Sequence, residues 1–124
     1  MRTGAFHCAS SPGALRSIGE ALLAAAGKAR DGTECVLKAA REDPRLPYAA
    51  AVPFLHLMGV VTGAHVLARA AKAASGRPDP DGYYASKIAL AQLYAAHVLP
   101  QAASYWESIR DGSEVVFQVS EAHL

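Results

Sequence analysis

Residues 48–75 read YAAAVPFLHLMGVVTGAHVLARAAKAAS, a stretch long enough to cross a small domain as one helix. At about 1.5 Å per residue, such a helix measures about 40 Å. A helix that is apolar on every face is typically buried on every face. The stretch therefore predicts the central helix of a helical bundle, buried all round. Apolar or small residues lie on two of its faces, one with Tyr48, Val52, Leu55, Gly59, Thr62 and Val66, the other with Phe54, Met58, Val61 and Ala68.

The composition favours one all-α globular domain. The chain has 124 residues, 52% of them hydrophobic, and a net charge of +1. Alanine is abundant and almost no segment alternates with period two, so only residues 113–119 compete as a strand. Charges of both signs are interspersed, which predicts neither a nucleic-acid partner nor a polybasic membrane contact.

Two further long helices flank the central one. From Gly13, apolar residues recur at steps of three and four up to Ala40, which predicts one long helix with Gly32 as the place for a bend. A third stripe of the same spacing predicts a helix over residues 81–110, kinked at Pro100. Proline and glycine residues mark the turns between the helices, and Asp79 and Asp81 are expected to cap the third helix.

The predicted fold is an antiparallel bundle of three long helices plus a short C-terminal helix, resembling a four-helix bundle. Residues 1–12 are expected to form a flexible leader, 13–119 the bundle and 120–124 a tail. Ser113 and Glu114 are expected to open the last short turn, which would fold Val116 and Phe117 back onto the bundle.

A membrane span and a secreted fate are both disfavoured. Residues 49–71 have the length of a spanning helix but include Pro53, His56, His65 and Arg69, which favours a bundle helix. Cys8 and Cys35 form no CxxC pair, so they are interpreted as free thiols. Together with the lack of a signal-peptide pattern in the first residues, this predicts a cytoplasmic protein.

The sequence offers helix-contact candidates but no chemistry. Gly59 and Gly63 form GVVTG, which lets two helix backbones approach closely, either within the bundle or across a self-association face. His56 and His65 point to nearly opposite faces of their helix, so they are expected to hydrogen-bond and not to share a metal.

A polar edge is predicted on the third helix. Tyr94, His97 and Gln101 follow helical spacing there and form either a polar seam against a neighbouring helix or a site for a polar group. Lys87 and Tyr83 add a mixed basic and aromatic surface. No catalytic set, phosphate loop or metal-ligand spacing is found, so no catalytic, cofactor-binding or metal residue is predicted.

Two segments of the second half resemble a known family. PFLHLMGVVTGAHVLARAA at 53–71 and YYASKIALAQLYAAHVLPQAA at 83–103 look like the extra helical domain that follows the catalytic domains in one branch of the acyl-CoA dehydrogenases. The resemblance covers about residues 46–121. It implies a flavoprotein oxidoreductase of fatty acid metabolism that uses FAD and a glutamate base, with this bundle packed on the dehydrogenase body.

The length of the chain departs from that family. With 124 residues it has no room for the catalytic domains, and none of its glutamates lies in a motif that matches the base. The resemblance therefore implies an accessory domain, either a fragment or a separately encoded copy, that is inactive alone and has upstream dehydrogenase domains or a dehydrogenase subunit as its partner. Its expected role is to support assembly or the surroundings of the acyl site. The alternative is a free-standing interaction module that forms a homodimer.

Overall fold

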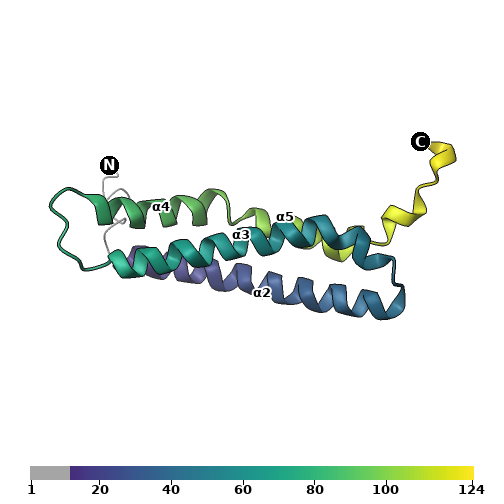
Figure 1. Ribbon diagram of the computed structural model, residues 1–124, viewed down its shortest axis with the longest axis horizontal. Coiled ribbons are helices and arrows are strands. Elements are labelled where there is room, and N and C mark those ends of the chain that lie inside the picture. Colours follow the sequence, from purple (N-terminus) through teal and green to yellow (C-terminus); the bar gives the residue numbers. More distant parts are fainter. Residues whose placement is uncertain (1–11) are drawn as a thin grey trace.

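All regular elements in the computed structural model, which describes residues 12–124, are helices (Figure 1). Two long helices run antiparallel, and two shorter ones in line form the third pass along them. This confirms the predicted all-α bundle, while the predicted leader and Cys8 lie outside the described residues apart from Pro12. The elements are α2 (Pro12–Glu42), α3 (Leu46–Ala74), α4 (Tyr83–His97), α5 (Gln101–Gly112) and the short 3-10 helices η2 (Val115–Gln118) and η3 (Glu121–His123).

The first long helix, α2, is continuous through its glycines. Gly32, named as the place for a bend, is instead a point of close packing. A Cβ added at Gly32 would lie 3.0 Å from Cδ2 of Leu57 and 3.5 Å from Cδ1 of Ile109. The missing side chain therefore lets α3 and α5 approach α2 closely.

The core is built mostly from small side chains. Alanines alternate with a few large aliphatic residues, of which Leu57 and Ile109 are the largest that are fully buried. No polar or charged side chain is buried among the residues described. Small core residues let helices pack at short distance, and the interior is accordingly apolar and without internal hydrogen-bonded networks.

The central helix, α3, contradicts the prediction that it is buried all round. It packs against α2 and against α4 and α5, but its remaining side is open. Tyr48 is 82% exposed and Leu55 is 69% exposed. Three helical passes can enclose only part of the circumference of any one helix, so the face of α3 that carries Tyr48 and Leu55 is left uncovered. By length and composition α3 could cross a membrane, and 17% of its most apolar window is buried within the bundle.

The third pass is broken at the predicted kink. The amide groups of Val98 and Leu99 both donate to the carbonyl oxygen of Tyr94, at 2.9 Å each, and Pro100 then precedes α5. Because Pro100 lacks an N–H and its ring clashes with the preceding turn, the helix restarts after it. The single helix predicted over residues 81–110 is therefore two helices, α4 and α5.

The N-terminus of α4 is capped by the aspartates of the preceding turn, as predicted. One carboxylate oxygen of Asp79 accepts from the amide of Tyr84 at 3.1 Å, and the other accepts from the amide of Ala85 at 2.8 Å. Asp81 accepts from the amide of Tyr83 at 3.2 Å. The two aspartates thus satisfy amide groups that the first turn of a helix leaves without partners.

The segment after α5 does not fold back onto the bundle as expected. η2 forms after Glu114, but Val116 and Phe117 remain exposed, at 54% and 42%. Figure 1 shows this segment leaving the end of the bundle and extending beyond it. A four-residue 3-10 helix is too short to turn both side chains toward the core.

Candidate functional site

The described residues offer no metal site. Within residues 12–124, no group of three His, Cys, Asp or Glu side chains lies close enough to hold a metal ion. The surface hollows are open, with about 140 Å³ beside Leu99 and about 370 Å³ beside Leu15. The core between the helices is apolar, and no polar side chain is buried among the described residues.

The two glycines of GVVTG have different environments. Gly63 faces α4, and the hydroxyl group of Tyr94 occupies the space where its side chain would lie. That hydroxyl donates to the carbonyl oxygen of Val60 at 2.8 Å. Burial of the phenol raises the pKa of Tyr94 above its ordinary value. Gly63 and Tyr94 thus form one tight, directional contact between α3 and α4.

Gly59 lies on the open side of α3, and a Cβ added there would meet no atom within 4 Å. The prediction that it marks a helix crossing inside the bundle is wrong. In an α-helix, residues four apart differ by about 40° in direction, enough here to place Gly63 against α4 and Gly59 outside.

The other polar candidates do not converge. His97 and Gln101 are exposed, and the break at Pro100 separates them, so they form no common edge with Tyr94. Gln101 accepts a hydrogen bond of 3.2 Å from the Tyr105 hydroxyl group. No site for a polar group forms between helices at these positions.

The two histidines of α3 were expected to hydrogen-bond. His56 instead stacks on the ring of Tyr105, with the ring centres 5.2 Å apart, and His65 is exposed. Neither imidazole makes a hydrogen bond to another residue of the described part of the chain. Both side chains are exposed, so solvent can hydrate their imidazole groups instead.

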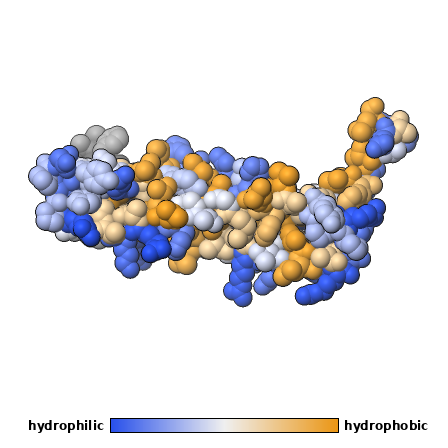
Figure 2. All heavy atoms as spheres, in the orientation of Figure 1, coloured by the Kyte–Doolittle hydropathy of each residue, from blue (hydrophilic) through white to orange (hydrophobic). Residues whose placement is uncertain are grey.

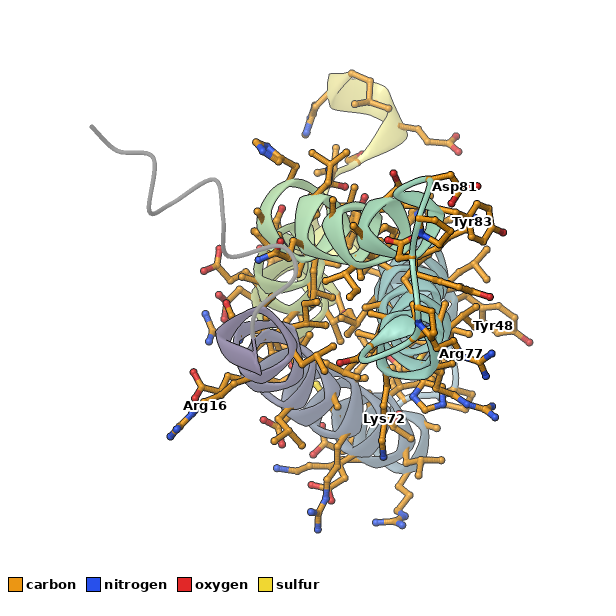
Figure 3. All side chains as sticks on the ribbon, turned by 90° about the vertical axis from the view of Figure 1, so that its left-hand side faces the viewer. Arg16, Tyr48, Lys72, Arg77, Asp81 and Tyr83 are labelled. Atoms are coloured by element: carbon orange, nitrogen blue, oxygen red, sulfur yellow. The ribbon has the colours of Figure 1, made fainter. Side chains whose placement is uncertain are left out.

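An uncovered apolar surface, here called the α3 outer face, is the most extended feature of the bundle. Figure 2 shows apolar residues along the middle of the side on which α3 lies in front. Tyr48, at one end of this face, points away from the bundle in Figure 3. The spacing was visible in the sequence, but which of the two apolar faces is covered depends on the positions of the other helices. The face consists of Tyr48, Val52, Leu55, Gly59, Thr62 and Val66.

A second uncovered surface is the C-terminal arm, residues 115–124. The ring centre of its Phe117 lies 4.7 Å from the guanidinium carbon of Arg45 in the turn between α2 and α3. Arg45 also pairs with Asp43 at 2.8 Å, and these hydrogen bonds lower the pKa of the Asp43 carboxyl group. The sequence predicts Val116 and Phe117 folded back onto the bundle and not an exposed arm. Its exposed apolar residues are Val115, Val116, Phe117, Val119 and Leu124.

The mixed aromatic and basic surface at the start of α4 is confined to a small cluster. Lys87 Nζ lies 4.9 Å from the centre of the Tyr83 ring, and Arg77 lies 5.7 Å from that of Tyr84. Figure 3 shows Arg77, Tyr83 and Asp81 together at this end of the bundle. Arg77 also donates to the carbonyl oxygen of Ala73 at 2.8 Å, so contacts within the chain hold this cation.

One comparison with known proteins identifies a family. A family model described as "Acetyl-CoA dehydrogenase C-terminal like" matches residues 3–120. No curated protein and no solved structure matches the chain. The matched range contains α2, α3, α4 and α5, the α3 outer face and residues 115–120 of the C-terminal arm.

Proposed function

The chain belongs to the acetyl-CoA dehydrogenase C-terminal-like family, and from this premise we propose that it is the accessory helical domain of an FAD-dependent acyl-CoA dehydrogenase in the cytoplasm. It supports assembly of the enzyme or the surroundings of the acyl site, and takes no part in the chemistry itself. The flavin and the catalytic base belong to the dehydrogenase domains, which are its partner.

The C-terminal arm carries this proposal. Its apolar side chains extend beyond the end of the bundle and lie exposed, from Val115 at 49% to Leu124 at 91%. Burying a valine or phenylalanine side chain at a partner surface is favourable by about 1.5–3 kcal/mol before the cost of ordering. Several such residues on one short segment are enough to anchor a domain on a larger body.

The root of the arm is held in place by the bundle. Arg45 lies over the Phe117 ring, and Ser113 Oγ donates to the carbonyl oxygen of Ile109 at 2.9 Å. A segment with a fixed root loses less conformational freedom when it docks than a free tail does. The arm is therefore already positioned to dock on a partner.

Binding to dehydrogenase domains prepared without their C-terminal domain tests the proposal. The purified chain is mixed with them, and the mass of the complex is measured by size-exclusion chromatography with light scattering. A stoichiometric complex is expected, which Phe117→Asp and Val119→Asp each weaken at least tenfold. Leu23→Asp is the matched control, because Leu23 is 75% exposed on α2, away from the arm.

Activity measurements on the chain alone give the second test. With an acyl-CoA, an electron acceptor and added FAD, we expect no turnover and no stoichiometric flavin binding. Either turnover or bound flavin would overturn the proposed accessory role, as would failure of the wild-type chain to bind the dehydrogenase domains. Equal weakening by the arm variants and by Leu23→Asp would remove the arm as the contact.

The alternative function, a free-standing helical module that forms a homodimer, is favoured by a different surface. The α3 outer face is uncovered along most of a 29-residue helix. Whether a partner binds the α3 outer face can be tested independently of the C-terminal arm.

A further inference from the structure

The α3 outer face has an internal symmetry. Its residues follow one another at steps of four, three, four, three and four, the spacing of a seam between two packed helices. Gly59 is the fourth of the six residues. Val52 and Val66 lie seven residues on either side of it, and Leu55 and Thr62 lie four and three residues away. A helix turned end for end about Gly59 would therefore present nearly the same face.

We propose that a second copy of this chain packs across the α3 outer face, with the two α3 helices antiparallel and a twofold axis at Gly59. Such an interface is isologous, because each copy contributes the same patch. The proposal does not depend on docking of the C-terminal arm, which is a separate surface.

Gly59 permits the close approach that this arrangement requires. It is exposed, and the space above its α-carbon is empty to 4 Å. Glycine at a crossing point lets two helix backbones approach more closely than larger residues do. On either side of the axis, Val52 then lies opposite Val66 of the second copy, and Leu55 lies opposite Thr62.

Charge selects the antiparallel direction. No residue of α3 is acidic, and its cation Arg69 lies toward its C-terminal end, at the edge of this face. A parallel pair would bring the two Arg69 side chains together at one end, with unfavourable repulsion. In the antiparallel pair the two Arg69 residues lie on the order of 30 Å apart along the axis. Each instead lies near Tyr48 of the other copy, whose exposed ring can accept a cation.

The area of the face suits a weak, transient dimer. From Tyr48 to Val66 the strip is about 27 Å long and, at a width of about 10–15 Å, offers roughly 270–400 Å² on each copy, or about 540–800 Å² in total, below the usual size of stable interfaces. An apolar patch of this size is among the largest on a typical monomer and is often a functional contact. We therefore expect dissociation in the high micromolar range or above and not an obligate dimer.

Cysteine cross-linking tests the axis. In the full chain with Cys8 and Cys35 replaced by serine, Gly59→Cys is expected to form an intermolecular disulfide under mild oxidation, because the two residues meet at the axis. A disulfide requires α-carbons within about 7 Å. Val52→Cys alone should not cross-link, since two copies of Val52 lie roughly 20 Å apart, whereas Val52→Cys combined with Val66→Cys should.

Two outcomes of the cross-linking experiment would overturn this arrangement. If Val52→Cys cross-links as fast as Gly59→Cys, the helices are parallel or the contact is random. If Gly59→Cys gives no disulfide while circular dichroism shows a folded chain, the axis does not lie there. An exposed glycine with no neighbour tolerates the substitution, so loss of folding is not expected.

Sedimentation equilibrium tests the dimer itself. The wild-type chain is expected to show a concentration-dependent mass between monomer and dimer, and Leu55→Asp should shift dissociation at least tenfold toward monomer. Adding Thr62→Lys to Leu55→Asp should restore the dimer, because position 55 of each copy faces position 62 of the other. Leu23→Asp on α2 should behave as wild type.

Other occupants of the face would appear as distinct results. A wild-type chain that stays monomeric at all concentrations overturns the proposal. So does a monomeric chain whose Leu55→Asp variant loses binding to the dehydrogenase domains, or to anionic phospholipid vesicles, because the face would then serve that partner. Failure of the arm variants in their own assay leaves these measurements unaffected.

Discussion

The Tyr94 hydroxyl group occupies the space that a side chain at Gly63 would need. Tyr94 reaches this position from α4 and is held there by its hydrogen bond of 2.8 Å to the carbonyl oxygen of Val60. One glycine of α3 therefore receives a side chain from the neighbouring helix. The other, Gly59, is open to solvent.

Alanine substitutions at the two glycines should have opposite effects on stability. Gly59→Ala meets no atom within 4 Å, so the better helix propensity of alanine should raise the free energy of unfolding by about 0.5–1 kcal/mol. Gly63→Ala displaces the Tyr94 hydroxyl group and should lower it by roughly 1–3 kcal/mol. Urea unfolding at low protein concentration measures both, and equal effects at the two positions would contradict the described contact.

The phenol of Tyr94 should make stability depend on pH in alkaline solution. Burial raises its pKa in the folded chain above the value of about 10 expected when unfolded. The unfolded state therefore loses the proton first. The stabilisation is complete below about pH 10 and is lost as pH rises from there through the folded pKa.

The variant Tyr94→Phe isolates this effect. It should cost about 1 kcal/mol near neutral pH through loss of the hydrogen bond to Val60. The difference in unfolding free energy between wild type and variant should then shrink above pH 10. A difference that is independent of pH would show that the Tyr94 phenol does not titrate differently in the two states.

The sequence predicted the helical fold because its signals are local. Periodic apolar residues, the Asp79 and Asp81 caps and the prolines at the turns act within one or two helical turns, so they can be recognised without coordinates. The break at Pro100 was located for the same reason. A kink was expected at Pro100, and the structure instead ends the helix there, with the amides of Val98 and Leu99 both donating to the carbonyl oxygen of Tyr94.

The exposed surfaces could not be predicted, because they depend on which helix lies beside which. The sequence places apolar residues on two faces of α3 but does not indicate which face the other helices cover. For the same reason, the sequence does not distinguish the environment of Gly59 from that of Gly63. It also suggested a bend at Gly32, where the helices instead pack closely. The sequence lacks any strong signal for the arm, whose exposure depends on its direction after Ser113.

Replacing Leu55 or Leu57 of α3 with alanine should change the free energy of unfolding by different amounts, because Leu57 lies on the buried side of the helix and Leu55 on the open side. Leu57 is fully buried, so Leu57→Ala should lower the free energy of unfolding by about 2–5 kcal/mol through lost burial and a cavity beside Gly32 and Ile109. Leu55→Ala in the dilute monomer should change it by less than about 0.5 kcal/mol. Chemical denaturation measures both, and a large effect of Leu55→Ala would mean that its side is covered in the monomer.

The root of the C-terminal arm should depend on Arg45. Arg45→Ala removes the cation over the Phe117 ring and the ion pair with Asp43, which together hold the arm near the α2–α3 turn. Amide hydrogens of residues 115–119 should exchange with solvent several-fold faster, while those of α2 and α3 keep their protection, because the arm contributes little to the core. Hydrogen exchange followed by mass spectrometry measures this.

Arg30→Ala is the control, since Arg30 pairs with Glu34 on exposed α2 and contacts no part of the arm. Unchanged exchange in the arm of Arg45→Ala would show that its root is held by η2 packing instead of by the cation.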